Sequence, residues 1–128
     1  MKLNVLFRIQ AIILALVGLA FLVVPATMQY GTLPANPSPQ LLAVVRATAS
    51  LFITIAVLDW VARNAEPSTA RNAIVLANAV GSLSAAILLA LAVFSGADKT
   101  ALIPVAVNLL IGIGFIMAGR ASMSAKAS

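Results

Sequence analysis

The sequence contains no cysteine and no histidine. Without cysteine there are no thiolate nucleophiles, no disulfides and no sulfur ligands for zinc, and without histidine there is no imidazole ligand for haem, copper or zinc. We therefore expect no metal site and no cofactor. The lack of disulfides says nothing about the redox compartment, because a helical bundle within lipid needs no covalent staples.

Charged residues are also scarce. They make up 9% of the 128 residues, whereas a soluble domain of this size carries about 25%. Hydrophobic residues reach 62%, and the mean hydropathy is +1.11. Water cannot be the main solvent of such a chain, and its length fits one compact unit. We predict a single transmembrane domain over residues 1–128.

Long apolar runs account for this composition. They cover residues 3–24, 41–62, 70–94 and 101–119. Each run can cross about 30 Å of hydrocarbon as a helix rising about 1.5 Å per residue, and none shows the alternating polarity of a membrane strand. Because the last two links are short, successive helices should be antiparallel. The predicted fold class is all-α, an integral membrane four-helix bundle with up-down-up-down topology.

Individual residues mark the helix boundaries. Pro25 should end the first helix, because proline cannot continue the hydrogen-bond ladder. Ser38 can cap the second helix, with Pro39 at its first position, and Asp98 can cap the fourth. Residues 121–128 are rich in serine and alanine, and we expect a flexible tail there.

Lysine and arginine are distributed unequally between the two predicted sides. One side holds Lys2, Arg8, Arg63, Arg71, Arg120 and Lys126, whereas the loops of the other hold only Lys99. The positive-inside rule then places both termini and the link between the second and third helices in the cytoplasm. These bases form no stripe with interleaved aromatic residues, so the net charge of +5 does not indicate a nucleic-acid partner. A cleaved signal peptide is the competing interpretation of the first run, but the run is too long for one.

Arg46 is the most conspicuous charge within a predicted span, where ionisable side chains are costly and are candidates for function. It lies near the outer end of the second span, so its side chain can extend to the headgroups. Alternatively, it faces the bundle or a partner subunit as an anion or headgroup site. Asp98 is its expected ion-pair partner.

Asp59 lies near the inner end of the same span, one turn before Arg63. An acid followed by a base at this spacing favours an ion pair, and Arg8 and Arg71 should lie in the same layer. We therefore expect Asp59 to be a paired anchor at the inner surface. A proton-coupled carboxylate would need to lie deeper and away from these bases.

Asn78 and Asn108 lie in the middle third of the third and fourth spans. Hydrogen bonds between helices are the expected role of such amides, and they contribute on the order of 0.6 to 2 kcal/mol in membranes. The alternative is a polar step along a pore or ligand cavity, which would include Ser82 and Ser84.

Small residues recur at four-residue spacing along the third span, at Ala73, Ala77, Gly81 and Ala85, and the fourth span carries Gly112, Gly114 and Gly119. Such stripes let helix backbones approach closely. We expect the stripe of the third span to pack inside the bundle, with packing against a second protein as the alternative. Trp60 and Tyr30 fit the interfacial preference of amphipathic rings.

Groups for catalysis are missing from the sequence. It shows no facing pair of carboxylates, no serine with a histidine to activate it and no glycine-rich phosphate loop. We expect that the protein is not an enzyme. The first span has no acidic residue, unlike that of the small multidrug transporters. The glycine-rich stretch leading to arginine and the dual topology of the fluoride channels are absent as well.

A short set of motifs resembles another group. The first span ends at Pro25, the second opens with Arg46 and closes with Trp60-Val61-Ala62-Arg63, and the third opens with Ala70-Arg71. In this layout the chain resembles the bacterial four-helix proteins grouped as DoxX-like, although Ala47, Thr48 and Ala49 stand where glycine is expected. The resemblance implies a multi-pass protein of the bacterial inner membrane and no particular activity.

The chain is rich in packing surface and poor in reactive groups. The leading hypothesis is a non-catalytic accessory or scaffold subunit of a larger membrane complex, with lipids and other membrane subunits or further copies of itself as partners. A small channel or carrier lined by Arg46, Asn78 and Asn108 is the second hypothesis. A lipid, quinone or pigment-binding module is the third.

Overall fold

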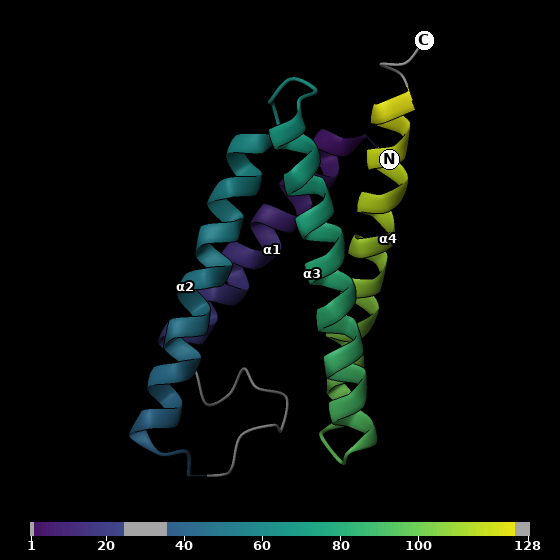
Figure 1. Cartoon of the computed structure of the whole chain (residues 1–128). Coiled ribbons are helices and arrows are strands. Elements are labelled where there is room, and N and C mark those ends of the chain that lie inside the picture. Colours follow the sequence, from purple (N-terminus) through teal and green to yellow (C-terminus); the bar gives the residue numbers. More distant parts are fainter. Residues whose placement is uncertain (1, 25–35, 125–128) are drawn as a thin grey trace.

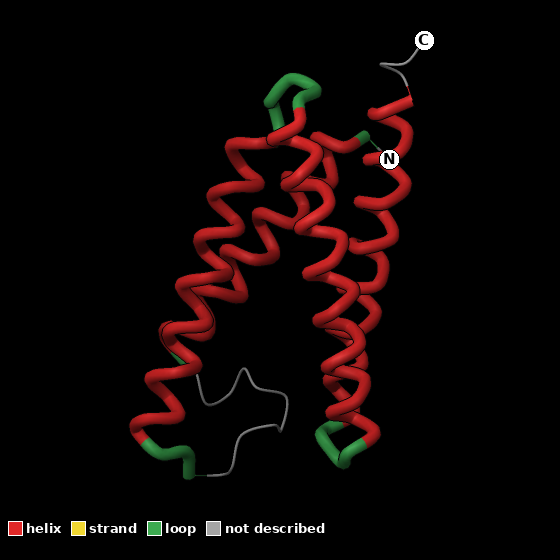
Figure 2. Tube along the Cα trace, in the orientation of Figure 1, coloured by secondary structure: helices red, strands yellow, loops and turns green. Residues whose placement is uncertain are grey.

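The computed structural model describes residues 2–24 and 36–124, and within them every regular element is a helix (Figures 1 and 2). The elements are α1 (Leu3–Val23), α2 (Pro39–Ala62), α3 (Thr69–Phe94), the short 3-10 helix η1 (Lys99–Ala101) and α4 (Leu102–Ser124). Four of these helices are long and apolar enough to cross a membrane. The all-helical prediction is confirmed.

The predicted caps form at two of the helix starts. The Oγ atom of Ser38 accepts a hydrogen bond from the backbone N–H of Leu41 at 3.2 Å, with Pro39 in the first turn of α2. Asp98 caps η1, which leads directly into α4, by accepting from the N–H of Thr100 at 2.8 Å. Each cap satisfies a backbone donor that has no partner within its own helix.

The helix ends differ from the prediction mainly in α4. This helix continues to Ser124, beyond the expected end at Gly119, so the expected tail begins as helix. α1 ends at Val23, and the two predictions for Pro25 and Tyr30 lie outside the described residues. Residues 125–128 lie outside them as well.

The helices form two hairpins, α1 with α2 and α3 with α4. Contacts within each hairpin far outnumber those between hairpins. In Figure 1 all four helices come together at the end that carries the α2–α3 loop, the start of α1 and the end of α4, and the hairpins diverge towards the other end. We call the first of these the joined end.

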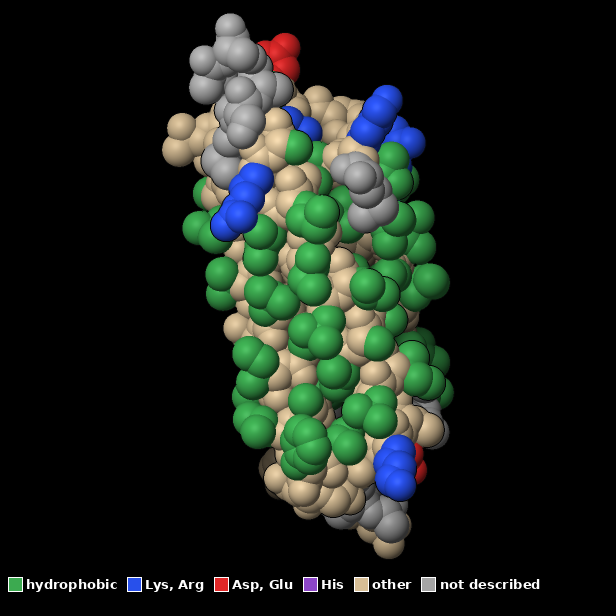
Figure 3. All heavy atoms as spheres, turned by 90° about the vertical axis from the view of Figure 1, so that its right-hand side faces the viewer, with side chains coloured by type: hydrophobic (Ala, Val, Ile, Leu, Met, Phe, Trp, Pro, Cys, Tyr) green, Lys and Arg blue, Asp and Glu red, His purple; other side chains and the backbone are tan. Residues whose placement is uncertain are grey.

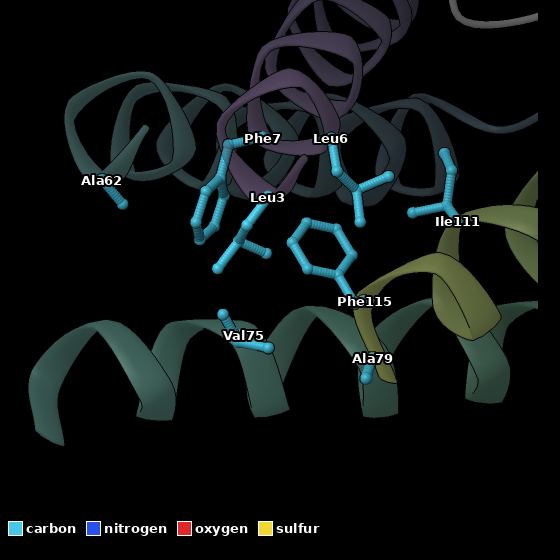
Figure 4. Close-up of a cluster of buried hydrophobic side chains, with 8 residues drawn as sticks. All are labelled: Leu3, Leu6, Phe7, Ala62, Val75, Ala79, Ile111 and Phe115. Carbon is cyan, nitrogen blue, oxygen red and sulfur yellow. The ribbon is translucent and has the colours of Figure 1, made fainter. Parts of the chain in front are cut away.

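A cluster of buried side chains holds the two hairpins together at the joined end. All four helices contribute to it (Figure 4), through Leu3, Leu6, Phe7, Ala62, Val75, Ala79, Ile111 and Phe115. The rings of Phe7 and Phe115 lie edge to face, with centroids 5.3 Å apart and planes at 65°. A smaller cluster, formed by Phe21, Val45 and Ala49, belongs to the α1–α2 hairpin alone.

Glycines let the helices of each hairpin approach closely. A Cβ atom on Gly18 would lie 2.8 Å from the Ile53 side chain and 3.1 Å from the carbonyl oxygen of Ala49. A Cβ on Gly112 would lie 2.8 Å from the Leu83 side chain, so Gly112 is a packing residue, as predicted. In lipid, such close van der Waals contact replaces the hydrophobic effect as the source of helix association.

The outer surface is predominantly apolar. Leu16, Leu88 and Leu110, from three different helices, are 63%, 66% and 73% exposed. Figure 3, which views the side of α4, shows a broad band of hydrophobic side chains with lysine and arginine towards the two ends. This is the surface of a protein whose surroundings are acyl chains at the middle and headgroups or water at the ends.

Candidate functional site

A buried carboxylate lies where the two hairpins meet. Asp59, near the C-terminal end of α2, has no exposed surface. Its Oδ1 atom accepts a hydrogen bond from the side-chain amide of Asn78 in α3, with an N–O distance of 2.5 Å. The predicted hydrogen bond between helices thus forms at Asn78, and it joins one hairpin to the other.

Gln10 extends this contact to a third helix. Its Nε2 atom donates to the Oδ1 atom of Asn78 at 3.2 Å, and the Gln10 side chain is 5% exposed. Asn78 therefore uses its amide as donor to one helix and as acceptor from another. We call Gln10, Asn78 and Asp59 the amide–carboxylate network.

Gln10 is not among the candidate residues predicted from the sequence. The signal was present, because Gln10 follows Leu3, Leu6 and Phe7 at helical spacing and shares their buried face. A polar residue on the buried face of a membrane span needs a partner in another helix.

Two oxygens of the network have no protein partner. They are Oε1 of Gln10 and Oδ2 of Asp59, and both are buried. Ser82, one turn after Asn78, is also buried on this face of α3. A buried acceptor without a donor costs roughly 1 to 3 kcal/mol. The network therefore has room to accept a further hydrogen bond, or a proton on the free oxygen of the carboxylate.

The expected ion pair between Asp59 and Arg63 does not form. The Arg63 guanidinium lies over the Trp60 ring, 3.8 Å from its centroid, and donates a hydrogen bond to the Trp60 carbonyl oxygen. Helical spacing brings the two residues near each other, but Asp59 faces the interior while Arg63 is the C-cap residue at the helix end. The prediction of a paired anchor was wrong, because an amide from another helix is the partner of the carboxylate.

Arg46 and Asp98 form no ion pair with each other in the part of the chain that the structure describes. The Arg46 side chain is exposed on α2, which excludes the interpretation that it faces the interior of this chain's own bundle. Asp98 caps η1, and the hydrogen bond from the Thr100 N–H lowers the pKa of its carboxyl group below the ordinary value.

Asn108 does not join the network. Its Nδ2 atom donates to the carbonyl oxygen of Pro104 at 2.8 Å, one turn earlier in α4. Ser84 is exposed on α3. Of the polar residues predicted to line one route, only Asn78 and Ser82 therefore share a buried face of the bundle.

The small-residue stripe of α3 faces outward. Ala73, Ala77 and Gly81 are exposed and Ala85 is half-buried, and a Cβ on Gly81 would meet nothing within 4 Å. The expectation that these residues pack inside the bundle was wrong. The buried face of α3 is instead formed by Val75, Asn78, Ala79, Ser82 and Ala86. Four-residue spacing drifts around a helix of 3.6 residues per turn, so it does not by itself specify the inward face.

No metal-binding group of three acidic, cysteine or histidine residues occurs among residues 2–24 and 36–124. The chemistry available in the network is that of one carboxyl group and two amides. The carboxyl group can bind or release a proton, and the oxygens of all three groups can bind a cation.

Four long apolar helices in two hairpins, joined through buried polar and aromatic side chains, are the fold of a helical multi-pass membrane protein. Compared with known proteins, the chain matches no family model, no curated protein and no solved structure. The DoxX-like resemblance therefore stays a prediction from its short motifs.

Proposed function

We propose that this chain is a non-catalytic accessory or scaffold subunit of a larger complex in the bacterial inner membrane. The proposed orientation is up-down-up-down with the joined end in the cytoplasm, since that end carries the excess of lysine and arginine. The observation that carries the proposal is the outward position of the α3 stripe, Ala73, Ala77, Gly81 and Ala85.

A stripe of small residues on a lipid-facing surface is a suitable contact for another membrane helix. It offers close backbone approach, which is the main source of helix association in lipid. A Cβ atom on Gly81 would meet no other atom within 4 Å, so the packing of this chain itself does not require glycine at this position. A partner helix seated on the stripe would use that space.

The packing of the whole chain supports a role in an assembly. In an 18-residue apolar stretch of each span, less than a third is buried, the share lying between 17% and 28%. Arg46, exposed on a different helix, supplies a charge that an acidic group of a neighbouring subunit can pair with. The partner is thus a second membrane protein with a small-residue helix face and an acid near the outer surface.

The test uses the absence of native cysteine, which allows single labels without background. Ala77→Cys in the tagged full-length chain should crosslink to another membrane protein in native membranes, whereas Leu76→Cys, exposed on a neighbouring face of α3, should not. Ala77→Leu with Gly81→Leu should reduce recovery of that partner at least roughly fivefold by blocking close approach.

Ala106→Leu is the matched control for added volume, because Ala106 is exposed on α4 and lies off the stripe. It should leave recovery of the partner unchanged. The proposal fails if the wild-type chain isolates in mild detergent as a monomer with no partner. It also fails if Ala77→Cys gives no more crosslinking to another membrane protein than Leu76→Cys does.

The amide–carboxylate network favours a second candidate, a small carrier or channel for an ion or small solute. A buried carboxyl group at the junction of two hairpins that diverge elsewhere could change its partners as the hairpins move. Flux of protons and of monovalent cations into proteoliposomes separates the candidates. A carrier would lose flux with Asn78→Leu and keep it with Asn108→Leu, whereas a scaffold would show no flux in any form.

A further inference from the structure

Three basic residues from the ends of three helices line one hollow at the joined end. The hollow has a volume of about 590 Å³, and its polar lining consists of Lys2, Asn4, Arg63, Asn64 and Arg71. Lys2 precedes α1, Arg63 ends α2 and Arg71 lies in the first turn of α3. The fold therefore brings Lys2 beside the two arginines that flank the α2–α3 loop, and no acidic side chain lines the described part of this hollow.

The basic groups are placed to receive an anion. The Nε atom of Arg71 is buried and has no protein partner. Arg63 is held by its stacking on Trp60, so its guanidinium is restrained before any ligand arrives. The N-terminal end of α3, where Arg71 lies, adds the partial positive charge of the helix dipole.

An apolar hollow lies between α1 and α4, deeper in the span. It has a volume of about 230 Å³ and is lined only by Leu6, Ile9, Ile13, Val107, Leu110 and Ile111. The basic hollow is bordered by the same two helices, at Leu3 and Ala118. An amphiphile with an anionic head therefore meets both a charged and an apolar surface along one pair of helices.

We propose that the basic hollow binds the phosphate of an anionic phospholipid, with an acyl chain lying in the apolar hollow. Phosphate suits the site because arginine binds it with paired, charge-assisted hydrogen bonds, and basic pockets between membrane helices are typical sites for anionic headgroups. The site goes beyond the proposed scaffold role, because it does not involve the α3 stripe.

The single tryptophan provides the probe. Trp60 contacts Arg63 at the border of the hollow, so occupation of the site should alter its emission. Phosphatidylglycerol is titrated into the full-length protein in a neutral detergent, alongside phosphatidylcholine and inorganic phosphate. We expect saturable change with phosphatidylglycerol and at least roughly tenfold weaker binding of the other two. The choline cation of phosphatidylcholine offsets the charge of its phosphate, and inorganic phosphate has no acyl chain for the apolar hollow.

Lys2→Gln with Arg71→Gln should weaken phosphatidylglycerol binding roughly tenfold or more. Arg120→Gln is the matched control, because Arg120 is an exposed base on the part of α4 that lies at the joined end, and it does not line the hollow. It should leave the affinity within about twofold. Unchanged helical circular dichroism and size-exclusion profiles show that the double variant is folded.

Two outcomes would overturn the proposal. If inorganic phosphate changes the emission as strongly as phosphatidylglycerol, the site binds a free anion and not a lipid. If Arg120→Gln weakens binding as much as the double variant does, the attraction belongs to the whole basic end and not to this hollow.

Discussion

At the scale of single residues, the most consequential contact is that of Asn78. Its amide bonds Asp59 on one side and Gln10 on the other, so its removal leaves two buried polar groups without their partner. A buried polar group without a hydrogen-bond partner lowers stability by more than the hydrogen bond had raised it, because lipid offers no water to replace the lost bond.

Asn78→Leu should therefore lower the free energy of unfolding by about 2 kcal/mol, measured by denaturant titration in mixed micelles. Asn108→Leu, the matched control, should cost less than about 1 kcal/mol, because the Asn108 amide bonds a carbonyl of its own helix. Equal losses in the two variants would show that the network does not join the hairpins.

At the scale of helices, glycines have opposite roles according to the face that they occupy. Gly18 lies against the Ala49 carbonyl oxygen and the Ile53 side chain, whereas Gly81 faces open space. A methyl group added at the first position must displace a backbone atom or a packed side chain. A methyl group added at Gly81 meets no neighbour and only reduces the conformational freedom of the unfolded chain.

Gly18→Ala should destabilise the isolated chain by about 1 to 2 kcal/mol, because overpacking outweighs the gain in helix propensity. Gly81→Ala should be neutral or stabilise it by up to about 1 kcal/mol. Thermal unfolding of the detergent-solubilised monomer measures both. A stabilising Gly18→Ala would contradict the close approach of α1 and α2.

At the scale of the whole molecule, the two hairpins are joined chiefly at one end. Phe115 lies at the centre of that junction, fully buried and edge to face with Phe7. The corresponding ring in the α1–α2 hairpin is Phe21, which packs on Phe52 within that hairpin and does not reach the other. The relative position of the hairpins thus depends on a few side chains.

Phe115→Ala should broaden the distribution of distances between spin labels placed at Leu51→Cys in α2 and Ile113→Cys in α4, both of which are exposed positions. It should also cost about 2 to 4 kcal/mol of stability, as expected for deletion of a buried ring. Phe21→Ala should leave the distance distribution between hairpins unchanged. If both variants broaden it equally, the junction is not localised at the joined end.

Much of the fold could be predicted from the sequence, because the determining forces act locally. Hydropathy summed along a segment decides whether it is a span, and the caps at Ser38 and Asp98 involve atoms within a few residues of each other. The candidate residues were also identified in part, since any polar residue in an apolar span stands out. Their partners were predicted less well: Asp59 was paired with Arg63, and Gln10 was not considered.

By itself, the sequence determined the four apolar helices found among the described residues, where they begin, and that cysteine and histidine chemistry is excluded. Only the tertiary structure decided that the α3 stripe faces outward, that Asp59 meets an amide and that Lys2, Arg63 and Arg71 share a hollow. The physical reason is that a span is specified by its own composition. The facing of each side chain depends on how the helices rotate and cross, which is set by packing between residues far apart in the chain.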